Sequence, residues 1–129
     1  MNREKYSRQI LFKPVGAEGQ ERLRQSKAVI IGCGALGTAQ ANALARAGVG
    51  WLRIVDRDFV EESNLTRQLL FDESDAAENL PKAVAAAAKL RAANSSIRIE
   101  GLVTDANPAN MEELLAGATV VVDATDNFE

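Results

Sequence analysis

The sequence predicts an α/β fold with a doubly wound, mainly parallel sheet and helices on both faces. Short apolar runs rich in Val and Ile alternate with alanine-rich helical stretches along the chain. The first apolar run leads into the turn Gly32-x-Gly34-x-x-Gly37, and the second ends at Asp56. A strand, such a turn and a helix in this order are typical of a Rossmann-like sheet.

Local signals place each element in chain order. Residues 1–27 form a basic arm, and residues 28–129 form the Rossmann-like domain. A helix ends at Gly48, Ser63 is the N-cap of a short helix, and Pro81 opens another helix. The expected strands cover residues 28–32, 51–56, 97–103 and 118–123, and the expected helices cover 17–25, 35–47, 64–70, 81–93 and 110–116. Open doubly wound sheets usually have five or six strands, so we expect this chain to be the front part of a longer protein, truncated after the fourth strand.

Composition and charge limit the class of protein. With 129 residues, 47% of them hydrophobic, the chain forms one ordinary domain with a real core. Its net charge of −3 argues against nucleic acid as a partner, although the arm holds seven Lys/Arg and only three Glu. No apolar run is long enough for a membrane span and the charged start is no signal peptide, so we expect a cytoplasmic protein. The single Cys33 allows no internal disulfide, and we interpret it as a small apolar residue rather than a reactive thiol.

The glycine turn predicts a nucleotide site. Gly32 permits the tight turn, Gly34 lets backbone N–H groups approach a phosphate, and Gly37 lets the helix lie close to the sheet. The helix N-terminus offers N–H donors to an anion, and Asp56 at the end of the second strand can accept hydrogen bonds from a ribose. A tight turn without a ligand would also use glycine, but the flanking strand, helix and acid favour the nucleotide.

Two more polar segments follow strands whose carboxyl ends should meet the same crevice. The first runs from Asp56 through Asp58 to Arg67, and the second runs from Asp123 to Asn127. Arg67 could contact phosphate oxygens or be an exposed helix charge. Lys82 lies in the first turn of a helix, where a cation is disfavoured by about 0.3–1 kcal/mol, and a bound anion would explain it.

The absence of histidine excludes several mechanisms. A Ser-His-Asp triad and a Cys-His pair cannot be built from this chain. A carboxylate that attacks a phosphoryl group is already ionised and needs no base, but it does need cations and a divalent metal. Arg8, Arg67, Lys82 and Asp126 are the candidates.

Seven ordered motifs resemble the ThiF/MoeB/HesA family, the bacterial relatives of ubiquitin-activating enzymes. The resemblance extends from about Tyr6 to Phe128. The motifs are Tyr6-Ser-Arg8-Gln9, Gly32-Cys-Gly-Ala-Leu-Gly37, Ala47-Gly-Val-Gly50, Val55-Asp-Arg-Asp58, Ser63-Asn-Leu-Thr-Arg67-Gln68, Pro81-Lys82 and Asp123-Ala-Thr-Asp-Asn127.

The resemblance implies an adenylyltransferase that uses ATP and Mg²⁺. It would convert the C-terminal Gly-Gly carboxylate of a ubiquitin-like sulfur carrier into an acyl-adenylate and release pyrophosphate. By position, Asn64, Arg67 and Lys82 would contact phosphates, Asp126 would hold Mg²⁺, and Arg8 would reach the γ-phosphate region of the neighbouring subunit in a homodimer. The remaining nucleotide-binding positions would be Gly32, Gly34, Ala35, Leu36, Gly37, Asp56, Asp58 and Asn127. Relatives carry their zinc-binding cysteine pairs after the point where this chain ends.

Two other functions stay open at this point. A nicotinamide- or flavin-dependent oxidoreductase would also use the glycine turn and Asp56, and a non-catalytic nucleotide-binding module would need nothing more. Adenylylation is favoured because it alone needs Arg67, Lys82 and Asp126 around one crevice.

Overall fold

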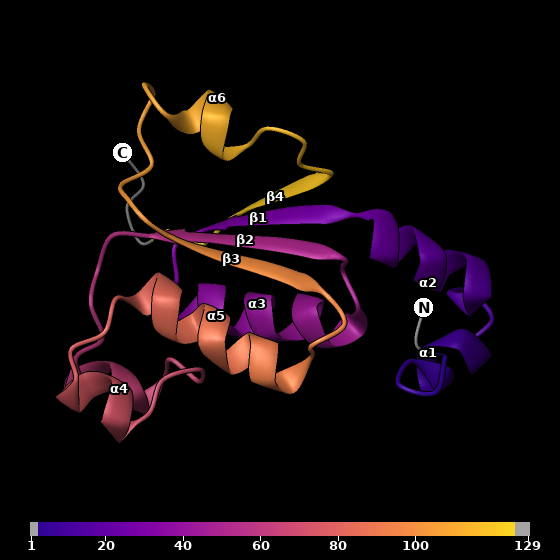
Figure 1. The fold of residues 1–129 in the computed structure, drawn as a ribbon, viewed down its shortest axis with the longest axis horizontal. Helices are drawn as coiled ribbons and strands as arrows, with labels where there is room; N and C mark the ends of the chain where they lie inside the picture. The colour runs from indigo at the N-terminus through magenta and orange to yellow at the C-terminus, as the bar shows by residue number, and fades with distance from the viewer. Residues whose placement is uncertain (1–2, 126–129) are drawn as a thin grey trace.

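The computed structural model describes residues 3–125 and confirms the predicted α/β fold (Figure 1). Its sheet consists of β1 (Lys27–Ile31), β2 (Trp51–Asp56), β3 (Arg98–Val103) and β4 (Val120–Asp123). The strands lie in the order β3-β2-β1-β4, and the three adjacent pairs are parallel. The strand order therefore reverses its direction at β1, which is where ligands bind in open α/β sheets.

Two alanine-rich helices, α3 (Ala35–Ala47) and α5 (Lys82–Ala93), lie side by side on one face of the sheet (Figure 1). Their small side chains let helix and strand backbones come close together. A Cβ atom placed on Gly101 of β3 would lie 2.3 Å from the carbonyl oxygen of Ala83 in α5. The main core lies between these helices and the sheet and includes Ile30, Ile54 and Leu90.

The opposite face carries the short helix α6 (Met111–Leu114), so the expectation of helices on both faces is confirmed (Figure 1). Leu114 packs there in a second, smaller cluster with Val29, Ile31 and Val55. Alternate residues of β1 thus enter the two clusters, as the side-chain alternation of a strand requires.

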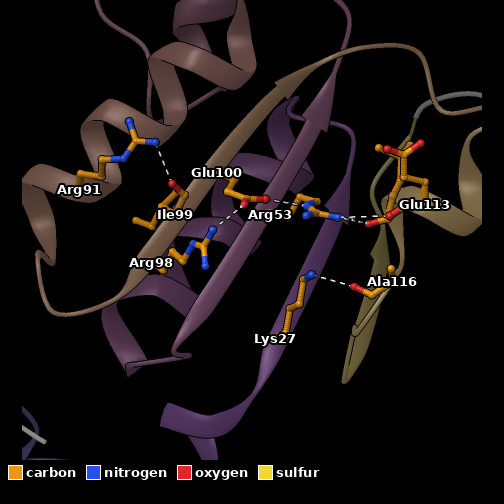
Figure 2. A network of polar contacts seen from close by, with 9 residues as sticks. Lys27, Arg53, Arg91, Arg98, Ile99, Glu100, Glu113 and Ala116 are labelled. Atoms are coloured by element: carbon orange, nitrogen blue, oxygen red, sulfur yellow. Dashed lines mark hydrogen bonds and ion pairs between the residues drawn. The ribbon is translucent and has the colours of Figure 1, made fainter.

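Basic side chains of the strands hold α6 against the sheet (Figure 2). Arg53 donates to the Leu114 carbonyl at 2.9 Å, and Lys27 donates from Nζ to the Ala116 carbonyl at 2.7 Å. The last carbonyls of a helix have no partner within it, so the contact from Arg53 satisfies the Leu114 carbonyl, and the contact from Lys27 ties the turn that follows α6 to β1. Burial lowers the pKa of the Lys27 ammonium.

The carboxylate of Glu100 forms ion pairs with two arginines of this network. Glu100 lies 2.8 Å from Arg53 and 3.5 Å from Arg98 (Figure 2). Lys27 lies 3.4 Å above the centroid of the Trp51 ring, and the Arg98 guanidinium lies 4.5 Å from it. Lys27, Arg53 and Arg98 therefore all have partners among the described residues, and these contacts give no reason to propose a ligand on this face.

The short elements are where prediction and structure differ. The expected helix over residues 64–70 with Ser63 as its N-cap is wrong. A 3-10 helix, η1 (Glu62–Thr66), stands there with Glu61 as its N-cap. The Asn64 side chain accepts a hydrogen bond from the Glu61 N–H at 2.8 Å, so the capping group comes from inside the turn.

Two five-residue helices were not expected, because so short a helix shows no apolar periodicity. They are α1 (Ser7–Leu11) and α4 (Glu73–Ala77). In α4, Asp72 and Asp75 each accept a hydrogen bond from the other's backbone N–H, at 3.0 and 2.9 Å, and Lys89 binds both carboxylates. The expected helix over 17–25 is α2 (Gly16–Gln25). Nowhere in residues 3–125 does a helix have the length and apolar character that crossing a membrane demands.

Candidate nucleotide-binding site

A cavity of about 650 Å³ opens at the carboxyl ends of the strands, where the sequence places the site. This volume lies within the range of small-molecule sites. Segments that follow all four strands contribute to it. Its lining includes Gly32, Cys33, Gly34, Asp56, Arg57, Asp58, Lys82, Thr104, Asp105, Ala106, Met111, Asp123 and Thr125.

The glycine turn has the geometry that its three glycines predict. Gly32 has φ of +102°, and a Cβ there would lie 2.8 Å from the Ala124 carbonyl oxygen. A Cβ on Gly37 would lie 2.1 Å from the Gly32 carbonyl oxygen. Gly34 differs, since a Cβ would meet only the Gln68 amide nitrogen at an ordinary 3.7 Å. The first and third glycines are therefore required by the fold, whereas the second faces the cavity.

The helix α3 begins directly after Gly34, which lines the cavity, whereas the predicted residues Ala35, Leu36 and Gly37 are not part of the lining. Gly34 is the N-cap of α3 and makes no side-chain cap. Ala35 and Leu36 follow it, both exposed. A helix N-terminus without a capping side chain leaves N–H groups for an anion, and the helix dipole favours negative charge there.

Asp56 ties this turn to the second strand. Its Oδ2 accepts a hydrogen bond from the Cys33 N–H at 2.7 Å, and its Oδ1 accepts one from the Asp58 N–H at 2.6 Å. Asp58 in turn accepts at its carbonyl a hydrogen bond from the Lys82 N–H at 2.9 Å. One chain of contacts thus places the glycine turn, the two carboxylates and the lysine around the cavity. The sequence predicts only a ribose contact for Asp56 and gives no signal for its hydrogen bonds to the Cys33 and Asp58 N–H groups.

The cavity lining contains two cations, the exposed Arg57, which lies 3.4 Å from Asp105, and the buried Lys82. Lys82 is the first residue of α5, directly after the N-cap Pro81, and its side chain is buried. The sequence predicts an unfavourable position at a helix N-terminus, and burial adds the cost of removing an ammonium group from water. An anion beside it would offset both costs.

Other predicted residues do not line the cavity. Asn64 is buried and caps η1, and Arg67 is exposed with its guanidinium bonded to the Ser63 carbonyl of its own turn at 2.9 Å. Asp126 and Asn127 lie outside the described residues. Their roles at the site stay predictions.

Gln68 was quoted as part of a motif but was not expected at the site. It is 5% exposed and lies against Gly34, while its Oε1 has no hydrogen-bond partner among residues 3–125. The Gln68 side chain thus packs beside the glycine turn, one residue after Arg67. Its position next to Arg67 in the sequence was the only available signal.

Cys33 has the structural role that the sequence favours. Its side chain is 1% exposed, and burial, assisted by the nearby Asp56 carboxylate, raises the pKa of the thiol to about 12. A thiol reacts as its thiolate, so Cys33 is inert near neutral pH.

Arg8 lies at the other end of the molecule. It belongs to α1, which sits beyond the amino ends of the strands, whereas the glycine turn is at their carboxyl ends (Figure 1). The 13 residues of α3 separate the two places, which corresponds to about 20 Å at 1.5 Å per residue. An arginine side chain cannot span that distance within one subunit.

Comparison with known proteins agrees with this geometry. The ThiF family model matches residues 6–129. The chain belongs to the ThiF family. One ThiF-family relative, the "Sulfur carrier protein ThiS adenylyltransferase" of Bacillus subtilis, is 54% identical over 97% of this chain and 37% of its own length. The "Molybdopterin-synthase adenylyltransferase" of Haemophilus influenzae is 42% identical over 97% of this chain and 51% of its own length.

Solved structures show the same ThiF-type fold. The Escherichia coli tRNA N6-threonylcarbamoyladenosine dehydratase TcdA, in complex with AMP, matches 97% of this chain and 50% of its own with a TM-score of 0.89 and 25% identity. The same dehydratase has also been solved in complex with ATP. This ThiF-family chain spans between about a third and a half of the length of the curated relatives named above.

Proposed function

We propose that the chain is the nucleotide-binding part of an ATP-dependent adenylyltransferase. Its substrate would be the C-terminal glycine carboxylate of a ubiquitin-like sulfur-carrier protein ending in Gly-Gly. The observation that carries this proposal is the buried Lys82 in the same cavity as the glycine turn and Asp56. Backbone N–H groups and an ammonium group together suit a polyphosphate, and the names of the two adenylyltransferase relatives support the class of reaction and of substrate.

The chemistry requires no base from this chain. One oxygen of the carrier carboxylate attacks the α-phosphorus of ATP, the bond from that phosphorus to the bridging oxygen breaks, and pyrophosphate leaves. The nucleophile is ionised near neutral pH, which is consistent with a sequence that holds no histidine. The task of the site is to hold two anions together and to stabilise the charge of the leaving group.

The proposed roles follow the resemblance and the geometry. Asp56 would bind the ribose, and Lys82 would stabilise the phosphates from inside the cavity. Asp58 would support the site. Arg67 would turn from the Ser63 carbonyl toward the phosphates. The other proposed nucleotide contacts are Gly32, Gly34, Ala35, Leu36, Gly37, Asn64, Asp126 and Asn127.

Mg²⁺ would be held by Asp126. Carboxylate oxygens are the ligands that Mg²⁺ prefers, and Asp56, Asp58, Asp105 and Asp123 line the described part of the cavity. When bound, Mg²⁺ supplies neutralisation of charge on the polyphosphate. Structural Zn²⁺ would require cysteine pairs that this chain does not contain.

Arg8 would act in a homodimer, at the γ-phosphate region of the neighbouring subunit. Its distance from its own glycine turn supports action between subunits. Mixing inactive Arg8→Ala and Arg67→Ala subunits should restore part of the activity through hybrid sites. Proven mixing without recovery would argue against it. We propose that the enzyme works in the cytoplasm.

Two experiments test the proposal. Calorimetry with Mg²⁺ present should show that the chain binds ATP and that NAD binds far more weakly, and preference for NAD would contradict it. In the second experiment, the chain replaces the matching segment of the Bacillus subtilis ThiS adenylyltransferase. The folded chimera should exchange labelled pyrophosphate into ATP when a Gly-Gly-ended carrier is present, and Asp126→Ala should abolish the exchange. A folded chimera that gives no exchange would refute the proposal.

A further inference from the structure

The N-terminal arm is fastened to the domain by hydrogen bonds on both sides of Arg8. Tyr6 is the N-cap of α1, and its buried hydroxyl accepts a hydrogen bond from Asn94 Nδ2 at 2.8 Å. Gln9 donates from Nε2 to the Ala47 carbonyl at 2.9 Å. The exposed Arg8 therefore stands between two tethered neighbours.

These tethers determine where α1 lies. The helix has five residues, none of them buried, and a helix of that length is not stable alone in water. Leu11 and Phe12, at its end, are 78% and 59% exposed, so they do not hold it against the domain. Tyr6 and Gln9 supply the contacts that do.

The Tyr6 ring packs directly against the backbone of Gly48. Gly48, which follows α3, has φ of +97°, and a Cβ there would lie 2.8 Å from the Tyr6 ring. Gln20 of α2 also donates to the Ala47 carbonyl and accepts a hydrogen bond from Gln9 at 2.6 Å. The end of α3 is thus shaped around the arm.

The network joins the arm to the two helices that carry the candidate site. Asn94 is 2% exposed, caps α5, and donates also to the Ala45 carbonyl near the end of α3 at 2.8 Å. Lys5 donates to Asn94 Oδ1 at 2.8 Å. Because α3 begins at the glycine turn and α5 begins at Lys82, the arm has a fixed position relative to its own subunit's cavity.

We propose that Tyr6, Gln9 and Asn94 are positioning residues, which hold Arg8 in the orientation that reaches the triphosphate of a second copy of this chain. The proposal rests on the proposed function, in which Arg8 acts between subunits. A free arm would lose entropy each time Arg8 met the neighbouring nucleotide, and the tethers remove most of that cost in advance.

The test measures the affinity of the dimeric protein for ATP and for AMP by calorimetry with Mg²⁺, while ultracentrifugation verifies the dimer. AMP has no γ-phosphate, so Arg8 would not contact it and AMP affinity should not depend on Arg8. Arg8→Ala should weaken ATP binding about tenfold or more and leave AMP binding unchanged. Tyr6→Phe keeps the ring on Gly48 and Gln9→Met keeps the side-chain length. Each should weaken ATP binding about threefold to tenfold and leave AMP binding unchanged.

Two further measurements separate positioning from stability. Adding Tyr6→Phe or Gln9→Met to Arg8→Ala should weaken ATP binding no further, because both act through Arg8. Lys27→Met removes a part-buried hydrogen bond from a side chain to a backbone carbonyl on the far face of the sheet, and it should leave the ratio of ATP to AMP affinity unchanged.

The outcomes distinguish failure of the proposed role of Arg8, which would also overturn the positioning role, from failure of the positioning role alone. If Arg8→Ala does not change ATP affinity, the assigned role of Arg8 is wrong. If Arg8→Ala weakens ATP binding but Tyr6→Phe and Gln9→Met do not, or if they affect AMP equally or add to Arg8→Ala, only the positioning role is overturned. Should Tyr6→Phe fail to fold, Gln9→Met on the exposed side of the network carries the same test.

Discussion

Two glycines of the same turn should respond in opposite ways to substitution by alanine. Gly37→Ala should destabilise the fold, and Gly34→Ala should leave the fold intact but block the nucleotide. The contrast follows from the backbone. A Cβ on Gly37 would lie 2.1 Å from the Gly32 carbonyl oxygen, whereas a Cβ on Gly34 would lie 3.7 Å from its nearest neighbour, an amide nitrogen at the end of the Gln68 side chain.

The size of the first effect comes from two opposing terms. The neighbour of Gly37 is backbone, so either α3 or the turn must move by about 1 Å, and overpacking of this kind costs about 3 kcal/mol at the upper end of its usual range. Alanine regains about 1 kcal/mol of helix propensity. The net loss is about 2 kcal/mol. With an unfolding entropy of about 2.1 cal/mol/K per residue, that lowers Tm of a chain of 129 residues by about 7 °C.

Gly34→Ala should change stability by less than about 0.5 kcal/mol, because φ of −96° lies outside the left-handed region and the added contact is ordinary. Its methyl group would stand where a phosphate has to approach the backbone, so ATP affinity should fall at least about tenfold. Thermal unfolding and ATP calorimetry on both variants check these values. Equal loss of stability, or ATP binding by Gly34→Ala at the original affinity, would refute the assigned roles.

Four further predictions concern three side chains. Native Cys33 should react with a disulfide reagent at pH 8 over a thousandfold more slowly than an unfolded cysteine, and rapid native reaction would contradict its burial. Because the pKa of its thiol is raised to about 12, stability relative to Cys33→Ala should be constant below about pH 9 and then fall by up to about 1.4 kcal/mol per pH unit, measured by urea unfolding. Lys82→Met should weaken ATP binding at least about tenfold and change stability by less than about 1 kcal/mol, and an unchanged ATP affinity would remove Lys82 from the site. Glu100→Gln should lower the urea unfolding free energy by about 1 kcal/mol through its contact with Arg53, and no change would show that the pair contributes nothing.

Elements whose signals are local could be predicted from the sequence. The helix over residues 35–47 and the strand over 51–56 have the expected bounds, because a glycine turn, a left-handed glycine at Gly48 and an apolar run specify them within a few residues. Pro81 likewise opens α5 as expected. The carboxyl ends of parallel strands meet at one edge, so the position of the cavity followed from the same information.

Other parts depend on residues far apart in the chain and could not be predicted. The docking of α1 depends on Asn94, 88 positions from Tyr6, and no local pattern contains it. The 3-10 turn of η1 replaced an expected α-helix, because Asn64 caps the turn from within instead of Ser63 from before it. The direction of the Arg67 side chain likewise could not be predicted, because it depends on the rotamer that lets the guanidinium donate to the Ser63 carbonyl.

Asp56 combines a role in the fold, shown by its hydrogen bonds to backbone N–H groups, with the proposed contact to the ribose. An ionised carboxylate offers about four acceptor positions, and the Cys33 and Asp58 N–H groups use two of them. Asp56 also lines the cavity, so its remaining acceptor positions are those that ribose hydroxyls would use in the proposed complex. The bond to Cys33 holds the glycine turn, and the bond to Asp58 leads through the Asp58 carbonyl to Lys82. If Asp56 binds the ribose as proposed, the same carboxylate would also set the spacing between the ribose and the phosphates, and a nucleotide would meet a site whose parts are already held at fixed distances.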